Sequence, residues 1–304
     1  MLYRNIVTAP DHGPYVREIR KAMPFIADTA AMGMATELVS YTERSRYTEM
    51  FEGFRLPHET VWLEHKTDAP FMKVADQITG GTARDVNERF QVIGYLFTTG
   101  PDDLVRINPF TADHDGDISE PFAGVQFSTR TGRTQVVIEH DIIREKMNKI
   151  TRAGIPGQVA SDFINQHISS LTDAAIVGAV IGSRLFTLMA AKDSPMDLVQ
   201  AGAMSRQERR RLARKAGPGE GNVPEMTRIV LNEEGRNHMR AVAEGSESGS
   251  SRKAHWVRGH LMRTETKGYV WRRSHVRGLG DPVMRPRSVS AISPETTDDP
   301  SPGF

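Results

Sequence analysis

The stretch FQVIGYLFTTGPDDLVRI (residues 90–107) decides the fold class. It holds two runs rich in β-branched and aromatic residues, and the Gly100-Pro101 pair between them is typical of a turn. Two further runs of the same kind follow, GVQFST (124–129) and RTQVVIEH (133–140). Because strands that follow one another in sequence usually pair, this region predicts an antiparallel meander.

Helical patterns lie on both sides of the meander. The first 55 residues are predicted to be mainly helical, and Pro24 should interrupt the first helical segment. Residues 141–191 return to helix, and residues 174–182 are apolar nearly all round. We expect that helix to be buried inside the domain or against a second subunit. The segments LPHETVWLEHK (56–66) and TRIVLNE (227–233) each predict one more strand.

These patterns predict an α+β protein in which helices accompany a small antiparallel sheet, with a C-terminal basic β-hairpin module. The α+β body should span residues 1–205. A basic connector with one strand and a flexible linker should follow at 206–251, because GSESGSS (245–251) is rich in Gly and Ser. The hairpin module should occupy residues 252–280, and a disordered tail residues 281–304.

The composition excludes several classes of protein. Hydrophobic residues make up 38% of the 304 and charged residues 25%, which is typical of soluble globular chains. Since the chain has no cysteine, disulfides, thiolate zinc sites and cysteine nucleophiles are excluded. No run approaches the roughly 18 apolar residues of a membrane span. The standard nucleotide, zincin and hydrolase motifs are absent, and the sequence predicts no metal and no cofactor.

The charge is unevenly distributed, although the net charge of the whole chain is only +1. Residues 206–215 contain six basic residues and one acidic residue, and residues 252–280 contain eight basic and one acidic. Residues 1–205 carry a net charge of −6. An acidic body with a basic C-terminal third is typical of proteins that bind a polyanion, most often nucleic acid.

The segment RKAHWVRGHLMRTETKGYVWRRSHVRGLG (252–280) carries the main functional hypothesis. The runs 253–263 and 268–278 flank the polar connection TETK and predict a β-hairpin. Arginine forks suit phosphate oxygens, and aromatic faces accept unstacked bases. The predicted nucleic-acid-binding residues are therefore Arg258, Arg263, Arg272, Arg273 and Arg277, together with Trp256, Tyr269 and Trp271.

Three other interpretations of this segment stay open. A metal-independent ribonuclease would use His255 or His260 with His275 as general base and acid, and Arg258 or Arg277 to stabilise the phosphorane. A metal site would use the three histidines and Asp281. In a purely structural interpretation the tryptophans are core residues, and the arginines are solvated or paired with the acidic body.

The pattern AHWVRGHLMR…GYVWRRSHVRG resembles a C-terminal module of uncharacterised proteins encoded by tailed bacteriophages and prophages. LPHETVWLEHK resembles an upstream segment of the same proteins. The resemblance implies a phage or prophage origin, and it implies no substrate and no catalytic residues.

We therefore expect a phage-derived, non-enzymatic protein that binds RNA or DNA in the cytoplasm of a bacterial host. The alternatives are the histidine-dependent ribonuclease and a structural component of the virion or of its assembly. Apart from nucleic acid, the expected partner is a second copy of the chain, in a homo-oligomer formed through the helix at 159–191. No membrane association is expected.

Overall fold

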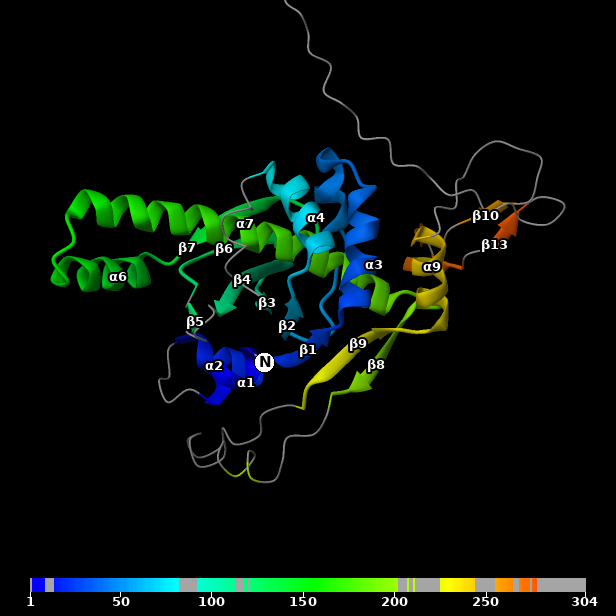
Figure 1. Cartoon of the computed structure of the whole chain (residues 1–304), viewed down its shortest axis with the longest axis horizontal. Helices are drawn as coiled ribbons and strands as arrows, with labels where there is room; N and C mark the ends of the chain where they lie inside the picture. The colour runs from blue at the N-terminus through cyan, green and yellow to red at the C-terminus, as the bar shows by residue number, and fades with distance from the viewer. Residues whose placement is uncertain are drawn as a thin grey trace, which may run out of the picture.

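Helices pack on both faces of a large mixed β-sheet in the computed structural model (Figure 1). The structure describes residues 2–8, 14–81, 92–112, 118–119, 121–201, 207, 210, 225–243, 255–257, 259–264, 268–273 and 275–277. The linker predicted at 245–251 and the tail predicted at 281–304 lie outside these residues.

Within the described residues, nine strands form the main sheet, in the order β7-β6-β4-β3-β2-β1-β9-β8, with β5 paired to β4. The strands are β1 (Met23–Ala27), β2 (Thr60–Lys66), β3 (Val92–Thr99), β4 (Leu104–Ala112), β5 (Ile118–Ser119), β6 (Ala123–Ser128), β7 (Thr134–Ile138), β8 (Met196–Gln200) and β9 (Thr227–Leu231). Strand β1 is parallel to both of its neighbours, β2 and β9. All other pairs in the sheet are antiparallel.

The helices divide between the two faces of the sheet. One face is covered by α1 (Leu2–Thr8) and α2 (Pro14–Lys21). The other is covered by α3 (Thr29–Ser40), α4 (Ala69–Thr79) and α7 (Gly157–Ala190). The remaining elements are the 3-10 helix η1 (Arg44–Met50), α6 (His140–Arg152), which precedes α7, and α9 (Glu233–Ala243), which follows β9.

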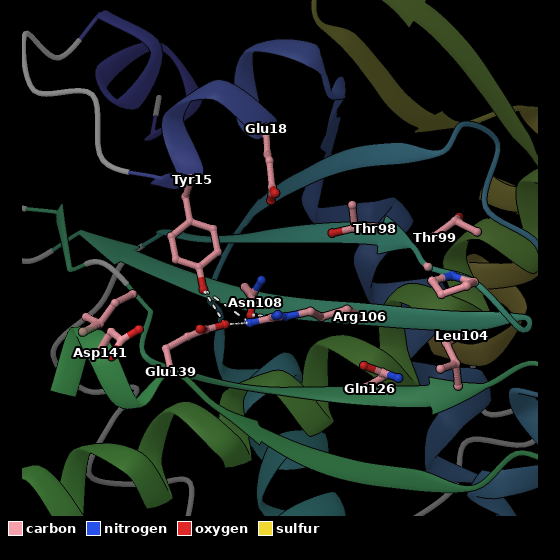
Figure 2. A pocket seen from close by; sticks show the side chains of 13 residues that line it. Tyr15, Glu18, Thr98, Thr99, Leu104, Arg106, Asn108, Gln126, Glu139 and Asp141 are labelled. Atoms are coloured by element: carbon pink, nitrogen blue, oxygen red, sulfur yellow. Dashed lines mark hydrogen bonds and ion pairs between the residues drawn. The ribbon is translucent and has the colours of Figure 1, made fainter. Parts of the chain in front are cut away.

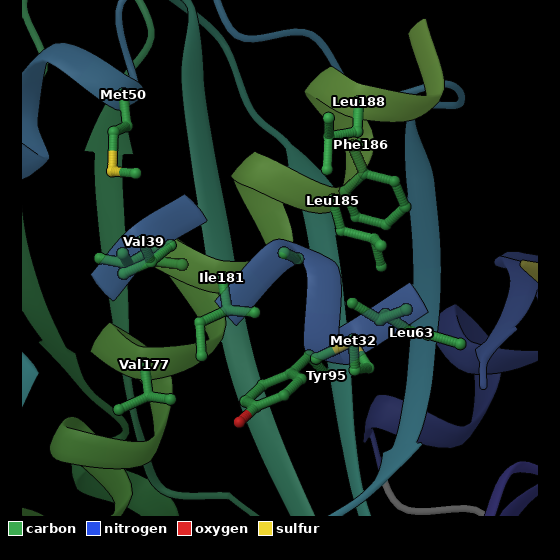
Figure 3. Close-up of a cluster of buried hydrophobic side chains, with 14 of the residues drawn as sticks. Met32, Val39, Met50, Leu63, Tyr95, Val177, Ile181, Leu185, Phe186 and Leu188 are labelled. Atoms are coloured by element: carbon green, nitrogen blue, oxygen red, sulfur yellow. The ribbon is translucent and has the colours of Figure 1, made fainter. Parts of the chain in front are cut away.

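Side-chain alternation along the strands builds the two larger of three cores; the third and smallest lies where α6 and α7 pack beside Phe122. Val61 and Leu63 of β2 point to α3 and α7, whereas Trp62 between them packs against the α1–α2 face. Figure 3 shows the larger core, where Ile181 of α7 lies near Tyr95 of β3. A chain of this length buries enough apolar surface for such a two-sided arrangement.

Local signals define the helix boundaries. Asp28 and Asp68 accept hydrogen bonds from the backbone N–H groups of Ala31 (2.7 Å) and Phe71 (2.9 Å), so each caps the N-terminus of a helix, α3 or α4. Gly80 follows α4 with a φ of 78°, the left-handed conformation that ends many helices and that glycine adopts without strain.

The α+β class and the meander are confirmed, and the predicted size and direction of the sheet are wrong. Strands β3, β4, β6 and β7 form the antiparallel meander predicted from residues 90–140. The full sheet, however, is large and mixed rather than small and antiparallel. Strand β9, predicted as part of the connector, lies beside β1 within this sheet.

Strand β1, which lies between β2 and β9, was missed because Pro24 was interpreted only as a helix breaker. Pro24 lacks a backbone N–H, but its φ suits an extended strand, and the neighbouring Phe25 is buried. Strand β8 was also missed: no strand was predicted at its residues, and four of its five side chains are exposed.

The buried half of α7 lies inside the chain's own fold. Val177, Val180, Ile181 and Leu185 belong to the larger core and are buried without any second subunit. By length and composition α7 could cross a membrane, although most of its apolar residues are covered by the rest of the fold. The apolar helix was the reason for predicting a homo-oligomer through residues 159–191. Because the chain's own fold covers this helix, that reason no longer applies, and the homo-oligomer stays a prediction.

The backbone of β3 packs closely against the ring of Trp62 at Gly94, so a larger residue there should destabilise the fold. A Cβ atom at this position of β3 would lie 2.1 Å from Cζ2 of Trp62, whose ring is fully buried. We expect Gly94→Ala to lower the free energy of unfolding by about 1–3 kcal/mol in urea titrations, because the ring cannot move away without strain. Gly157→Ala, where a Cβ meets nothing within 4 Å, is the matched control. Equal stability of both variants would contradict the packing argument.

Candidate functional site

The predicted C-terminal hairpin is present as two short antiparallel ladders. Strands β11 (His260–Thr264) and β12 (Gly268–Arg272) form one ladder, and β10 (His255–Val257) and β13 (His275–Arg277) form the other. The pairs His260–Arg272 and Val257–His275 belong to the same register, so the two ladders continue one hairpin. Gly268 begins β12 with a φ of 67°, as expected of a residue that leaves a tight connection.

Backbone hydrogen bonds attach the hairpin to the end of α7. The N–H of Lys192 donates to the carbonyl of Tyr269 (3.2 Å), and the N–H of Trp271 donates to the carbonyl of Lys192 (3.0 Å). Leu261 and Tyr269 also pack against the larger core. The hairpin is therefore fixed to the body, which an isolated two-stranded ribbon in water would need for stability.

Trp271 is a core residue, which corrects its assignment as a stacking surface. Its side chain is 1% exposed and belongs to the larger core. The ring of His238 in α9 meets the indole edge-to-face at 5.3 Å. Gly259 leaves room for the indole, since a Cβ there would lie 2.4 Å from Cζ2 of Trp271. An indole enclosed in this way has no free face for a base, so the structural interpretation holds for this residue.

The basic side chains of the same ladder are exposed. His260 and Arg272 pair across the strands on the face opposite Leu261 and Trp271. Arg263 and Arg273 are exposed as well. Arg258 lies outside the described residues, as do the side chains of His255, Trp256, His275 and Arg277. Of the basic run at 206–215 only Gln207 and Arg210 are described, and both are exposed.

The register does not place His260 opposite His275, whereas the other pair of the ribonuclease hypothesis, His255 with His275, lies diagonally across the β10–β13 ladder. His260 pairs with Arg272, whereas His275 pairs with Val257 on the neighbouring ladder. Among the described residues, no cluster of three histidine or acidic side chains suits a metal ion. Of the four ligands in the metal interpretation only the side chain of His260 is described; those of His255, His275 and Asp281 lie outside the described residues.

A second site, which the sequence analysis did not identify, is a pocket of about 600 Å³ on the α2 face of the sheet. It lies between α2, the strands β3, β4 and β6, and the start of α6. Figure 2 shows Tyr15, Arg106, Asn108 and Glu139 close together at one end of it. The pocket is thus built from segments more than 100 residues apart.

An ion pair organises this end of the pocket. The guanidinium of Arg106 donates to the carboxylate of Glu139 and also contacts the Tyr15 hydroxyl (3.4 Å) and the side-chain oxygen of Asn108 (3.3 Å). The Tyr15 hydroxyl donates to the same carboxylate (3.3 Å). Glu139 occupies the N-cap position of α6, but its side chain makes no capping hydrogen bond. Its carboxylate instead bonds to Arg106 and Tyr15 in the pocket.

Burial raises the pKa of Tyr15 well above its usual range, with Arg106 opposing the rise and Glu139 adding to it. The hydroxyl therefore stays protonated throughout the physiological pH range and acts as a neutral donor and acceptor. The positive charge of Arg106 is balanced by Glu139.

One sequence signal marks this pocket. In β4, Arg106 and Asn108 alternate with Val105 and Ile107, and in β6 Gln126 lies between the apolar Val125 and Phe127. Polar residues at alternate positions of neighbouring strands indicate one open, polar face of a sheet. The convergence of Tyr15 and Glu139 on that face depends on the fold and has no local signal.

Comparison of the chain with family models, with curated proteins and with solved structures finds no match. The functional argument therefore rests on the residues of this chain alone.

Proposed function

We propose that this protein binds nucleic acid, RNA or DNA, through the solvent side of the C-terminal hairpin. The observation that carries the proposal is the division of the β11–β12 ladder into two faces. Leu261 and Trp271 fix one face to the body, while Arg272 and His260 remain exposed on the other. Because the hairpin is fixed to the body, less conformational entropy is lost when its arginines bind phosphates.

The charge of the segment supports this proposal. Residues 252–280 contain eight basic residues and one acidic residue. Arg272 on the solvent face, Arg273 directly after β12 and Arg263, which pairs with Tyr269, are all exposed. Arginine presents a planar fork of donors that matches phosphate oxygens. Since the indole of Trp271 is enclosed, contacts with phosphates should contribute more than stacking on bases.

The proposal predicts a steep salt dependence of binding. Affinity for short single-stranded RNA and DNA oligonucleotides, measured by fluorescence anisotropy, should fall linearly with salt on logarithmic axes. Replacing Arg272 and Arg273 with Ala should weaken binding and reduce the slope by about 0.7 for each phosphate that the protein no longer neutralises.

The matched control is Arg130→Ala with Arg133→Ala, two exposed arginines beside the meander whose removal changes the net charge equally. This control should retain the wild-type slope. Equal weakening in both double variants would assign binding to general surface charge. No binding at low salt would overturn the proposal.

The other two functions stay predictions. The register separates His260 from His275, and the side chains of the alternative pair, His255 and His275, lie outside the described residues, so no described contact favours the ribonuclease hypothesis. The virion or assembly hypothesis rested on the burial of the 174–182 helix, which the chain's own sheet provides. Origin from a phage or prophage rests on the sequence resemblance alone.

A further inference from the structure

The pocket beside α2 is separate from the basic hairpin. Arg106 and Asn108 point to the α2 face of the sheet, whereas the hairpin is attached to the end of α7, which covers the opposite face. The volume of about 600 Å³ lies within the range of roughly 300–1,000 Å³ typical of small-molecule sites. The size and the converging polar groups therefore indicate a second binding site.

The charges of the pocket exclude an anion as its natural occupant. Of the described residues that line it, Arg106 is the only cation, and Glu139 neutralises it. Glu18 and Asp141 add two carboxylates to the lining. A phosphate or carboxylate entering here would lose part of its hydration and would find no uncompensated cation in return, which is unfavourable.

The carboxylates of Glu18 and Asp141 would attract a small cation only weakly. Glu18 is exposed. The side chain of Asp141 is 94% exposed and already pairs with Arg144. Attraction between an incoming ammonium and such solvated carboxylates is weak, because water screens it.

Neutral polar groups form the floor of the pocket. Thr98, Asn108 and Gln126 come from three adjacent strands and supply hydroxyl and amide groups that both donate and accept hydrogen bonds. Leu104 and Ile142 add apolar surface to the lining. A ligand with several hydroxyl groups on a compact carbon ring complements this mixture, since each hydroxyl also donates and accepts.

We propose that the pocket between α2 and the β3–β4–β6 face binds a neutral, polyhydroxylated small molecule of the monosaccharide or cyclitol class. The Arg106–Glu139–Tyr15 group holds the polar end of the site in place before the ligand arrives. Preorganised donors and acceptors of this kind reduce the ordering cost of binding.

The test is a titration of the full chain, followed by NMR or calorimetry, with D-glucose, D-galactose, D-mannose, D-ribose and myo-inositol. At least one of these should bind saturably. Its phosphorylated derivative should bind at least about tenfold more weakly, because the phosphate would lose part of its hydration without gaining an uncompensated cation. Gln126→Ala should weaken binding about three- to tenfold by removing one hydrogen-bonding group.

Gln135→Ala is the matched control for Gln126→Ala. Gln135 of β7 pairs with Gln126 across the strands but does not line the pocket, so its removal should leave affinity unchanged. The proposal is overturned if no neutral member of the panel binds, or if the phosphorylated derivative binds as tightly. Stronger binding of the diamine putrescine than of every neutral member would also overturn it, as would equal effects of the two glutamine variants.

Discussion

Trp271→Ala is expected to lower the free energy of unfolding by about 3–5 kcal/mol, the usual cost of truncating a large buried aromatic side chain. The indole is 1% exposed, contacts His238 of α9 and closes over Gly259. Its removal should leave a cavity where the hairpin, α7 and α9 meet. Urea or thermal unfolding measures the destabilisation directly.

The neighbouring Arg272→Ala is the control for this prediction. Arg272 is exposed, so its truncation should change stability by no more than about 0.5 kcal/mol. Together the two variants separate the buried face of the hairpin from its exposed face. If Trp271→Ala were as stable as the wild type, the indole would not be a core residue in solution. The attachment of the hairpin to the body would then lose its main evidence.

Sequence patterns predicted the antiparallel meander better than the parallel part of the sheet. The meander strands β3, β4, β6 and β7 are rich in β-branched and aromatic residues and are joined by recognisable turns, so their pairing followed from local signals. Strand β1 has five residues, includes Pro24 and forms parallel pairs with partners far away in sequence. Nothing local distinguishes such a strand from a break between two helices.

For the candidate sites, too, the sequence predicted some features and not others. The exposed positions of Arg272 and Arg273 agree with a segment whose charge was visible in the sequence. Trp271 was assigned to nucleic-acid stacking because basic and aromatic residues alternate there, yet an aromatic residue on one face of a hairpin packs equally well on a body. Which face meets the body is decided by Lys192 and His238, which lie far away in sequence.

A second large effect is expected from pH, through His65 on strand β2. The imidazole is fully enclosed between the rings of Phe71 and Tyr95. Its Nδ1 lies 2.9 Å from the carbonyl oxygen of Lys66. Because a carbonyl only accepts, Nδ1 carries the proton, and Nε2 has no hydrogen-bond partner among the described residues.

Burial lowers the pKa of His65 to about 4, against an ordinary value of 6.5, while the hydrogen bond to Lys66 and the Asp68 carboxylate act in the opposite direction. The folded protein therefore holds this side chain neutral, and the unfolded chain binds a proton more readily. The stability that depends on neutral His65 is fully present above pH 6.5 and is lost as the pH falls towards 4.

Between about pH 7 and pH 4.5, His65 should account for a decrease of about 2–3 kcal/mol in the free energy of unfolding. His65→Phe keeps a ring between Phe71 and Tyr95 but removes the titrating group. Its urea-derived stability should therefore fall less steeply with acid than that of the wild type, whatever constant cost the substitution carries. His58→Gln, at an exposed position, should keep the wild-type slope. Parallel pH curves for His65→Phe and the wild type would show that His65 does not control the acid dependence of stability.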